Sequence, residues 1–498
     1  MKPVFSLRGV MLDPGRVTER KEYYRELLPW LAEWGYNLIH LHLIDDQRCA
    51  LRFPSHPELA TPGAFTPEEM RGFVALARSH GLEVMPEVEC LGHTALITSH
   101  PKYRHLAEKP PPGAHFNAIC PSHPDTRRLL GDLLRDVAEI FPHPVIHVGL
   151  DEVQFGDCPR CTQFEQRLGR GGGRARLAKR AGRSRTAGAC ATDGVQGRWP
   201  WRFAEHAAWV HETVRGLGRR PAMWADHVVE RPEMMKSFRR DVLMFNWQYV
   251  PEYESAKAGL LLEAGFEVVA CPALVCYGTR IAPNAMNLAN LRNTAARSLP
   301  ERRRGLVGLV NTVWCPWRYL PGAIDYGLAL GAHLFTAEAE DPRFAERFAK
   351  RFYGLGDGRR VGAALAGLYE CGLEQRLHDR TMAGACRSEP FGREDRRLLG
   401  LVAERTGAVL AGLKSERGRV RRNRARYDDL IISAEAILAV ARFGAAGRRK
   451  SAVPGARALY LRAVRSWNRD RHPADAMRFG DGLHGAVQSL LHNLRGLR

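Results

Sequence analysis

The stretch HVGLDEV, His147–Val153, decides the fold of this 498-residue chain. An apolar run over residues 145–148 leads into it, and two adjacent carboxylates, Asp151 and Glu152, end it. Neighbouring side chains of a strand point to opposite faces, so adjacent acids share a pocket only where the strand ends and the backbone bends. Gly149 gives the backbone that freedom. The stretch therefore predicts a buried strand with an acid pair at its carboxyl end, where parallel α/β proteins bind ligands. The alternative is an acid pair that caps the next helix.

The same succession of apolar run, polar end and helix recurs along residues 1–337. The expected strands are 5–12, 37–44, 82–88, 145–148, 221–224, 241–246, 267–271 and 308–313. The segments between them have the apolar spacing of helices, and Thr66 with Glu69 has the spacing of a capping box before one of them. Eight strands alternating with helices predict a TIM (β/α)8 barrel. A doubly wound open sheet is the alternative, although no glycine-rich phosphate loop follows the first strand.

Two further regions depart from this rhythm. Residues 338–498 carry apolar side chains at helical spacing without alternating strands, which predicts an α-helical C-terminal domain. Residues 169–199 are rich in arginine and glycine and interrupt the barrel pattern. Their composition is typical of a solvated insertion, and a frameshifted segment would leave the same abrupt change.

The net charge of +20 raises the question of a nucleic-acid partner. Much of the excess arginine gathers in residues 167–185 and 414–426, and neither run is interleaved with the aromatic side chains that stack on bases. We therefore expect no nucleic-acid partner, while attraction of anionic glycans by these runs stays open. No window reaches the roughly 18 apolar residues of a membrane span, so we expect a cytoplasmic protein without a membrane partner.

Eleven cysteines, scattered and odd in number, predict reduced thiols rather than a disulfide framework. Cys158 and Cys161 form a CxxC pair in the stretch DCPRC. One such pair, without a second pair or histidines at ligand spacing, favours two packed thiols over a zinc site. We accordingly expect no metal and no other cofactor.

HVGLDEV resembles the H-x-G-x-D-E signature of glycoside hydrolase family 20, the retaining β-N-acetylhexosaminidases. Other stretches similar to that family follow its order: RGVMLD (8–13), HLHLIDDQ (40–47), PEVECLGHT (86–94), AMWAD (222–226), FNWQY (245–249) and NTVW (311–314). The resemblance spans residues 7–335 and does not extend to the helical C-terminal region. It implies a TIM barrel and a chain that lacks the α/β domain which many members carry before the barrel.

The resemblance also implies the chemistry, in which the 2-acetamido oxygen of the substrate attacks its own anomeric carbon. Glu152 is then the general acid and later the base, and Asp151 orients the acetamido group. Asp45 and His93 support the acid, and Tyr277 donates a hydrogen bond to the acetamido oxygen. Adjacent acids raise each other's pKa, which helps keep one of them protonated near neutral pH. For His93, an ordinary loop histidine is the alternative.

The residues that the resemblance implies for substrate binding are Arg8, Trp224, Asp226, Trp247 and Trp314. Arg8 is expected to bind hydroxyls of the terminal sugar. The tryptophans are expected to surround the acetamido methyl group and to support the apolar face of the sugar. A salt bridge for Arg8 and core packing for the tryptophans are the alternatives.

Three positions depart from the family pattern. Thr279 and Pro316 stand where many relatives carry acids that bind the hydroxyls farthest from the cleaved bond. Glu89 replaces a more usual aspartate. The first two departures leave open the choice between N-acetylglucosamine and N-acetylgalactosamine.

We therefore expect an exo-acting retaining β-N-acetylhexosaminidase whose partners are glycans that end in β-linked N-acetylhexosamine. One alternative is a retaining glycosidase for a sugar without an acetamido group, with Asp151 or Glu87 as its nucleophile. Another is a glycan-binding protein whose catalytic site has decayed, which would account for the missing acids.

Overall fold

The computed structural model describes residues 3–108, 118–156, 158–163, 199–276, 278–371, 373, 375–382, 391–472 and 489–498. Its strands are β1 (Leu7–Leu12), β2 (Leu38–His42), β3 (Glu83–Glu87), β4 (Val145–His147), β5 (Arg220–Trp224), β6 (Leu243–Trp247), β7 (Val268–Cys271), β8 (Ala273–Val275) and β9 (Leu306–Val313). All pairings are parallel, and β1 pairs with both β2 and β9, which closes the sheet. Strands β7 and β8 flank Pro272 and both lie along β9, so they share one position. The predicted eight-stranded TIM barrel is confirmed.

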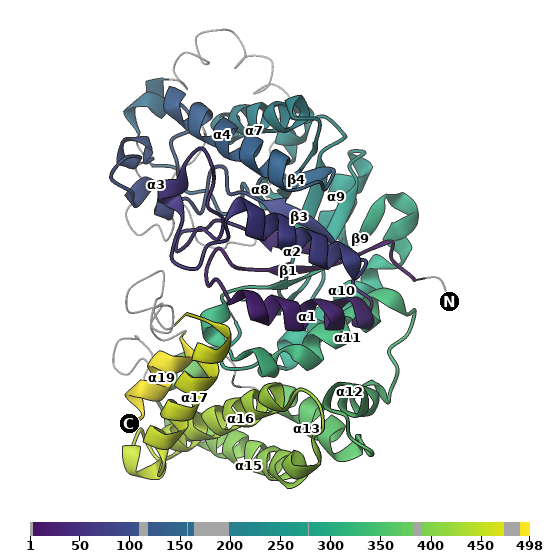
Figure 1. Ribbon diagram of the computed structural model, residues 1–498, viewed down its shortest axis with the longest axis vertical. Helices are drawn as coiled ribbons and strands as arrows, with labels where there is room; N and C mark the ends of the chain where they lie inside the picture. The colour runs from purple at the N-terminus through teal and green to yellow at the C-terminus, as the bar shows by residue number, and fades with distance from the viewer. Residues whose placement is uncertain are drawn as a thin grey trace.

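Helices follow the strands and surround the barrel (Figure 1). They are α1 (Lys21–Trp34), α2 (Pro67–Ser79), α3 (Ala95–Ser99), α4 (Pro124–Ile140), α7 (Trp199–Gly216), α8 (Asp226–Glu230), α9 (Ser255–Glu263), α10 (Ala285–Ser298) and α11 (Asp325–Thr336). The predicted capping box of α2 is present, because Thr66 and Glu69 each accept the other's backbone N–H. Such a cap stabilises a helix by about 1 kcal/mol.

Every element after α11 in the described part of the chain is helical, as predicted. These helices are α12 (Phe344–Tyr353), α13 (Arg359–Glu370), α14 (Gln375–Met382), α15 (Arg393–Glu416), α16 (Arg424–Ala445), α17 (Ala456–Asp470) and α19 (Leu490–Gly496). Those that are labelled in Figure 1 lie in the lowest part of the view, below α1 and α11. Their apolar faces join the hydrophobic core of the barrel in one continuous cluster, so the proposed domain boundary at residue 337 stays a prediction.

Buried polar contacts attach the helices to loops at the carboxyl end of the barrel. Arg280, in the loop after β8, donates two hydrogen bonds of 2.9 Å to the carboxylate of Asp379 on α14, and both side chains are fully buried. On the outside, the ring of Trp30 on α1 meets that of Phe352 on α12 edge to face, with 4.8 Å between the ring centres. The helical part therefore supports the loops of one barrel face as well as the wall.

The predicted insertion at 169–199 lies outside the described residues up to Trp199, where α7 begins. Among the helices that the structure describes, none combines the length and the apolar composition needed to cross a membrane.

Candidate active site

The acid pair lies on a tight bend directly after β4. Gly149, Leu150 and Glu152 all have positive φ angles, of 65°, 77° and 48°. Such angles are unfavourable for residues with a Cβ and persist where the surroundings enforce them, often at functional sites. A Cβ at Gly149 would meet the buried carboxylate of Glu89, so any other residue would force that side chain to move. The predicted bend is confirmed, with Asp151 buried and the side chain of Glu152 43% exposed.

His93 joins the acid pair to a second pair of carboxylates. Its Nε2 lies 3.3 Å from Glu152 Oε2 and 3.7 Å from Asp151 Oδ2. Its Nδ1 lies 3.3 Å from Asp46 Oδ2 and 3.7 Å from Asp45 Oδ2. Burial alone would lower the pKa of His93, but the charges of Asp45 and Asp151 raise it well above its usual range. The structure thus brings three predicted acids, Asp45, Asp151 and Glu152, around the predicted His93, together with Asp46, which was not predicted.

The two acids of the pair differ in proton affinity. Burial raises the pKa of Asp151 to about 8, against the effect of His93 and with further support from the charges of Asp226 and Glu152. Glu152 behaves in the opposite way, because its contact with His93 outweighs desolvation and holds its pKa below the usual range. The pair therefore holds one proton near neutral pH, as expected from two adjacent acids. The raised pKa is that of Asp151 and the lowered pKa that of Glu152, whereas the sequence predicts the acid role for Glu152.

Arg16, which the sequence analysis did not single out, is the arginine of this site. Its guanidinium lies 2.9 Å from Asp45 Oδ2 and 3.2 Å from Asp13 Oδ2, and it covers the ring of Trp314 at 4.8 Å. Burial raises the pKa of Asp45, but the charges of Arg16 and His93 lower it to about 2, so Asp45 is an anion. The positive charge of Arg16 also reaches Glu152, whose pKa it lowers.

The structure corrects the prediction for Arg8. This residue lies at the amino end of β1, where its side chain donates hydrogen bonds to the backbone oxygens of Phe5, Ser6 and Gly35. The acid pair lies at the opposite, carboxyl end of the barrel. Arg8 is therefore a structural residue, and Arg16, eight positions later and beyond the end of the strand, takes its place at the site.

A second, deeper polar cluster lies below the acid pair. Glu87, at the end of β3, is fully buried, and its two oxygens lie 2.6 Å from His42 Nδ1 and 2.6 Å from Trp224 Nε1. The Nδ1 of His147 is 3.0 Å away. Burial would raise the pKa of Glu87, but His42 and His147 hold it well below the usual range. His42 also lies 2.8 Å from Asp45 Oδ2 through its Nε2, so it links the two clusters.

The predicted tryptophans occupy different depths. Trp224 is fully buried and bonded to Glu87, so it supports the site from below and is not exposed at its surface. Trp314 packs on it with 5.8 Å between ring centres and is nearly buried. Trp247 is partly exposed and stacks on Tyr249, whose hydroxyl accepts a hydrogen bond of 2.8 Å from Trp314 Nε1. Tyr249 is a further aromatic side chain of the site that the sequence analysis missed.

The remaining predicted residues have mixed outcomes. Asp226 Oδ2 accepts a hydrogen bond of 3.1 Å from the backbone N–H of Glu152, so Asp226 positions the acid pair. Tyr277 lies outside the described residues. Thr279 and Pro316, where the family pattern has acids, are buried, and the hydroxyl of Thr279 bonds to Asn287.

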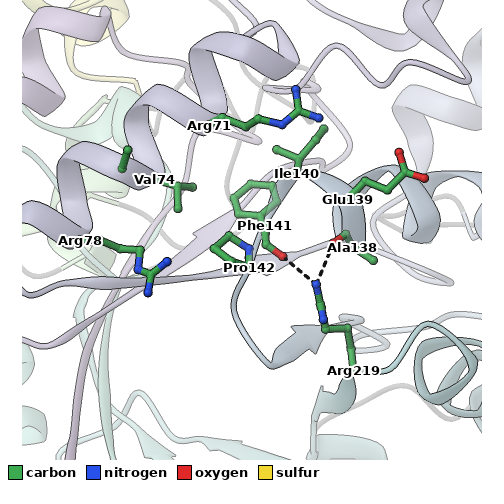
Figure 2. A pocket seen from close by; sticks show the side chains of 10 residues that line it. Arg71, Val74, Arg78, Ala138, Glu139, Ile140, Phe141, Pro142 and Arg219 are labelled. Carbon is green, nitrogen blue, oxygen red and sulfur yellow. Dashed lines mark hydrogen bonds between the residues drawn. The ribbon is translucent and has the colours of Figure 1, made fainter.

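A hollow of about 380 Å³ at the other end of the barrel has no part in this site (Figure 2). It lies between α2 and the end of α4, and its rim carries Arg71, Arg78 and Arg219. The side chain of Arg219 donates to the backbone oxygens of Ala138 and Phe141. None of the predicted site residues lines it.

Comparisons with known proteins identify relatives of this chain. The chain is 27% identical over 191 residues to a beta-hexosaminidase of Akkermansia muciniphila, which covers 33% of this chain and 38% of that protein. It is 31% identical over 192 residues to a beta-hexosaminidase of Vibrio furnissii, with 32% and 31% covered, and 29% identical over 167 residues to the human beta-hexosaminidase subunit beta, with 31% and 29% covered. The matches span about a third of the length of these relatives.

Solved structures share the fold. An exo beta-N-acetylglucosaminidase of Vibrio harveyi has a TM-score of 0.55 at 21% identity, covering 74% of this chain and 59% of that chain. A chitobiase of Flavobacterium johnsoniae has a TM-score of 0.52 at 16% identity, covering 92% and 75%. The sequence model of the glycosyl hydrolase family 20 catalytic domain matches residues 5–290, more than half of the chain. The chain therefore belongs to glycosyl hydrolase family 20.

Proposed function

We propose that this protein is an exo-acting, retaining β-N-acetylhexosaminidase that works by substrate-assisted catalysis. The observation that carries the proposal is the acid pair on its bend, with His93 within 3.3 Å of Glu152 and 3.7 Å of Asp151. A pair that holds one proton can supply both an acid for the leaving oxygen and an anion for the acetamido group. Membership of the family and the relatives named as beta-hexosaminidases support the same substrate class.

In the first step, Glu152 protonates the glycosidic oxygen while the bond from this oxygen to the anomeric carbon breaks. The acetamido oxygen forms a new bond to that carbon, and the resulting cyclic cation is stabilised by the Asp151 carboxylate. Because the pKa of Asp151 is raised and that of Glu152 is lowered, this step requires that substrate binding shift a proton from Asp151 to Glu152. The acetamido N–H of the substrate favours an anionic hydrogen-bond acceptor, so its binding stabilises the ionised form of Asp151.

In the second step, Glu152 takes a proton from a water molecule, which attacks the anomeric carbon and opens the ring formed by the acetamido group. Two inversions at this carbon retain its configuration. The exposure of Glu152 fits this role, since both the leaving group and the water must reach it. His93 and the Asp45 anion, itself held by Arg16, keep Glu152 in place between the two steps.

The alternative with an enzyme nucleophile loses one of its two candidates. Glu87 is fully buried, and His42, His147 and Trp224 occupy its oxygens, so it has no path to a sugar. Asp151 remains the candidate nucleophile of a glycosidase for sugars without an acetamido group.

The test is the hydrolysis of three chromogenic substrates by the purified protein: the 4-nitrophenyl β-glycosides of N-acetylglucosamine, N-acetylgalactosamine and glucose. Cleavage of the acetamido sugars alone supports the proposal and gives the hexosamine preference. Equal cleavage of the β-glucoside would favour Asp151 as a nucleophile. A protein that is folded by circular dichroism and cleaves none of them would favour a decayed, glycan-binding site.

A further inference from the structure

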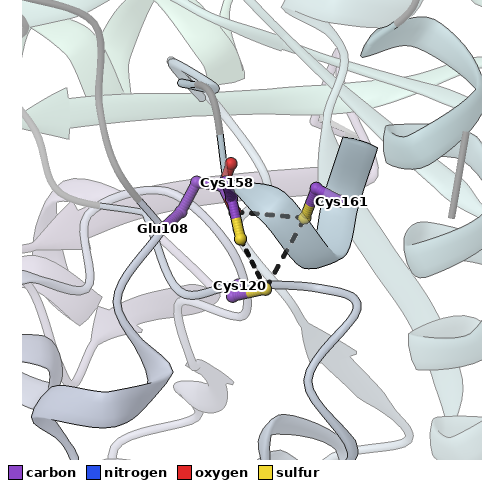
Figure 3. A group of neighbouring side chains, drawn as sticks. All are labelled: Glu108, Cys120, Cys158 and Cys161. Carbon is purple, nitrogen blue, oxygen red and sulfur yellow. Dashed lines mark hydrogen bonds between the residues drawn. The ribbon is translucent and has the colours of Figure 1, made fainter. Parts of the chain in front are cut away.

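Three cysteines and one glutamate meet in a buried cluster that the active site does not include (Figure 3). The cluster consists of Glu108, Cys120, Cys158 and Cys161, each at most 5% exposed. The sequence places Cys120 and Cys158 38 positions apart, and only the fold brings them together. Figure 3 shows the three sulfur atoms turned toward one another, with the carboxylate of Glu108 beside them.

The distances within this cluster are those of a tetrahedral metal site. The sulfur of Cys120 lies 3.6 Å from that of Cys158 and 3.5 Å from that of Cys161, and Cys161 Sγ lies 3.1 Å from Glu108 Oε2. Zinc–sulfur bonds of about 2.3 Å at the tetrahedral angle space two sulfurs by about 3.8 Å, and a sulfur and a carboxylate oxygen by about 3.5 Å. The three observed distances are a few tenths of an ångström shorter than these spacings, and all four ligand atoms lie within 4.8 Å of one another, so small shifts would place them around a zinc ion.

We propose that Glu108, Cys120, Cys158 and Cys161 form a structural zinc site. Three thiolates and one carboxylate suit a borderline-soft divalent ion, and four protein ligands leave no open position, as in structural rather than catalytic zinc sites. The expectation that Cys158 and Cys161 are merely packed thiols was based on an isolated CxxC. The fold supplies the third thiol and the carboxylate that this motif lacked.

The surroundings of Glu108 support an ionic site. The buried guanidinium of Arg202 donates from NH1 to Glu108 Oε1 at 3.1 Å, which leaves Oε2 directed at the sulfurs. Zinc with three thiolates and one carboxylate carries a net charge of about −2, so a buried cation beside it lowers the cost of burial. Partners of this kind orient metal ligands in known sites.

The backbone holds the ligands in place independently of the ion. Cys120 N–H donates to Leu106 O at 2.7 Å, and Glu108 N–H donates to Ala118 O at 2.8 Å, so these two ligands lie on facing segments. Cys158 begins a short helical turn, 159–163, that follows the acid pair. The ion would therefore fasten the loop after β4, which carries Asp151 and Glu152, to the loop after β3, which carries His93.

A disulfide is the competing interpretation. It would join two of the three sulfurs and would require them to approach to about 2.05 Å. It would give no role to the third thiol or to the pairing of Glu108 with Arg202. Zinc uses all four side chains.

The experiment measures zinc directly, without reference to glycoside cleavage. The full chain is purified with zinc in the growth medium and a thiol reductant, and its metal content is determined by elemental mass spectrometry. We expect about one zinc ion per chain in the wild type and in Cys371→Ser, which replaces another buried cysteine at the end of α13. Cys120→Ser and Cys161→Ser should each lose at least nine tenths of the zinc, since a neutral hydroxyl replaces a thiolate.

Cobalt substitution tests the site if these variants do not fold. Wild-type protein from which the zinc has been removed should bind one cobalt(II) ion, with a thiolate-to-cobalt charge-transfer band and the intense visible bands of a tetrahedral ion. Glu108→Gln should keep the charge-transfer band and bind cobalt more than tenfold more weakly. The proposal is overturned if the wild type holds no zinc at excess metal, if Cys371→Ser loses as much zinc as Cys120→Ser, or if peptide mapping finds a disulfide among the three cysteines.

Discussion

Two buried carboxylates at the carboxyl end of the barrel, Asp151 and Glu87, have opposite acid strengths. Burial raises the pKa of Asp151 to about 8, while Glu87, which is even more deeply buried, has a pKa well below its usual range. The difference lies in their partners. Nitrogen atoms of His42, His147 and Trp224 lie within 3.0 Å of the Glu87 oxygens. Asp151 has other acids nearby, among them Asp226 and Glu152, and one histidine nitrogen at 3.7 Å.

This difference assigns proton transfer to one cluster and structural support to the other. A carboxylate that accepts from several donors stays ionised near neutral pH and takes no part in proton transfer. The inner cluster around Glu87 is therefore a structural element. A carboxyl group with few donors and with acidic neighbours exchanges its proton easily, so the outer cluster around Asp151 and Glu152 is suited to proton transfer. The same kind of substitution, from acid to amide, should therefore have different effects in the two clusters.

The largest effect is expected from Glu152→Gln in the outer cluster. The amide keeps the shape of the side chain and has no acidic proton to donate, so kcat/KM for the aryl N-acetylhexosaminide that is cleaved best should fall by about 10² to 10⁴ fold. Steady-state kinetics at pH 6 measures the loss.

Glu233→Gln is the matched control for this change, because it alters an exposed glutamate in the short helix after α8. It should leave kcat/KM unchanged. A Glu152→Gln protein that is as active as this control would exclude Glu152 as the acid.

The next effect is expected from Glu87→Gln in the inner cluster. Removing this charge takes from the buried His42, whose pKa is well above its usual range, one of its two carboxylate partners, and breaking a buried ion pair from one side typically costs about 3 kcal/mol or more. Urea unfolding at pH 7 should therefore give a free energy of unfolding lower by about this amount. An unchanged midpoint would show that the inner cluster contributes nothing to stability.

Asp151→Asn should raise the free energy of unfolding, the opposite of the effect expected from Glu87→Gln. An unfolded aspartate ionises near pH 4, whereas the folded Asp151 keeps its proton up to about pH 8, so its burial costs stability increasingly as the pH rises between these values. The asparagine variant should be more stable than the wild type at pH 8 and equally stable at pH 4. Activity should behave in the reverse manner, with acetamido sugars losing turnover selectively.

The pH–rate profile of the wild type provides the second half of this test. Above about pH 8 the acid pair loses its shared proton, so kcat/KM should fall about tenfold per pH unit. A profile that stays flat to pH 10, or an Asp151→Asn protein that is destabilised at pH 8, would show that the proton does not reside on Asp151.

Local pattern was sufficient for the barrel and for the acid pair. The alternation of strands and helices, the capping box at Thr66 and the bend at Gly149 depend on a few neighbouring residues, and the structure has all three. The contrast between Asp151 and Glu87 was not accessible in this way. Both acids follow or end a strand, and only their three-dimensional neighbours distinguish them.

The missed residues illustrate the same limit. Cys120 lies 38 positions before Cys158 in the sequence, and no short motif connects the two. Only the fold brings Cys120 to Cys158 and Cys161. Arg8 lies at the amino end of β1 and Arg16 lies beyond its carboxyl end, and their roles depend on which end of the barrel each faces. A motif identifies the strand, but it does not give the direction in which a long side chain extends.

The smallest effect concerns these two arginines. Arg16→Lys removes the planar group that contacts Asp13, Asp45 and the ring of Trp314 together, while keeping a positive charge. We expect KM for the aryl N-acetylhexosaminide to rise about tenfold and kcat to change less, because both Asp45 and the wall of the site lose a fixed partner. Arg8→Lys, the matched change at the other end of β1, should leave KM unaltered. Equal effects of the two changes would mean that Arg16 acts on stability alone, and a larger effect of Arg8→Lys would restore the original prediction.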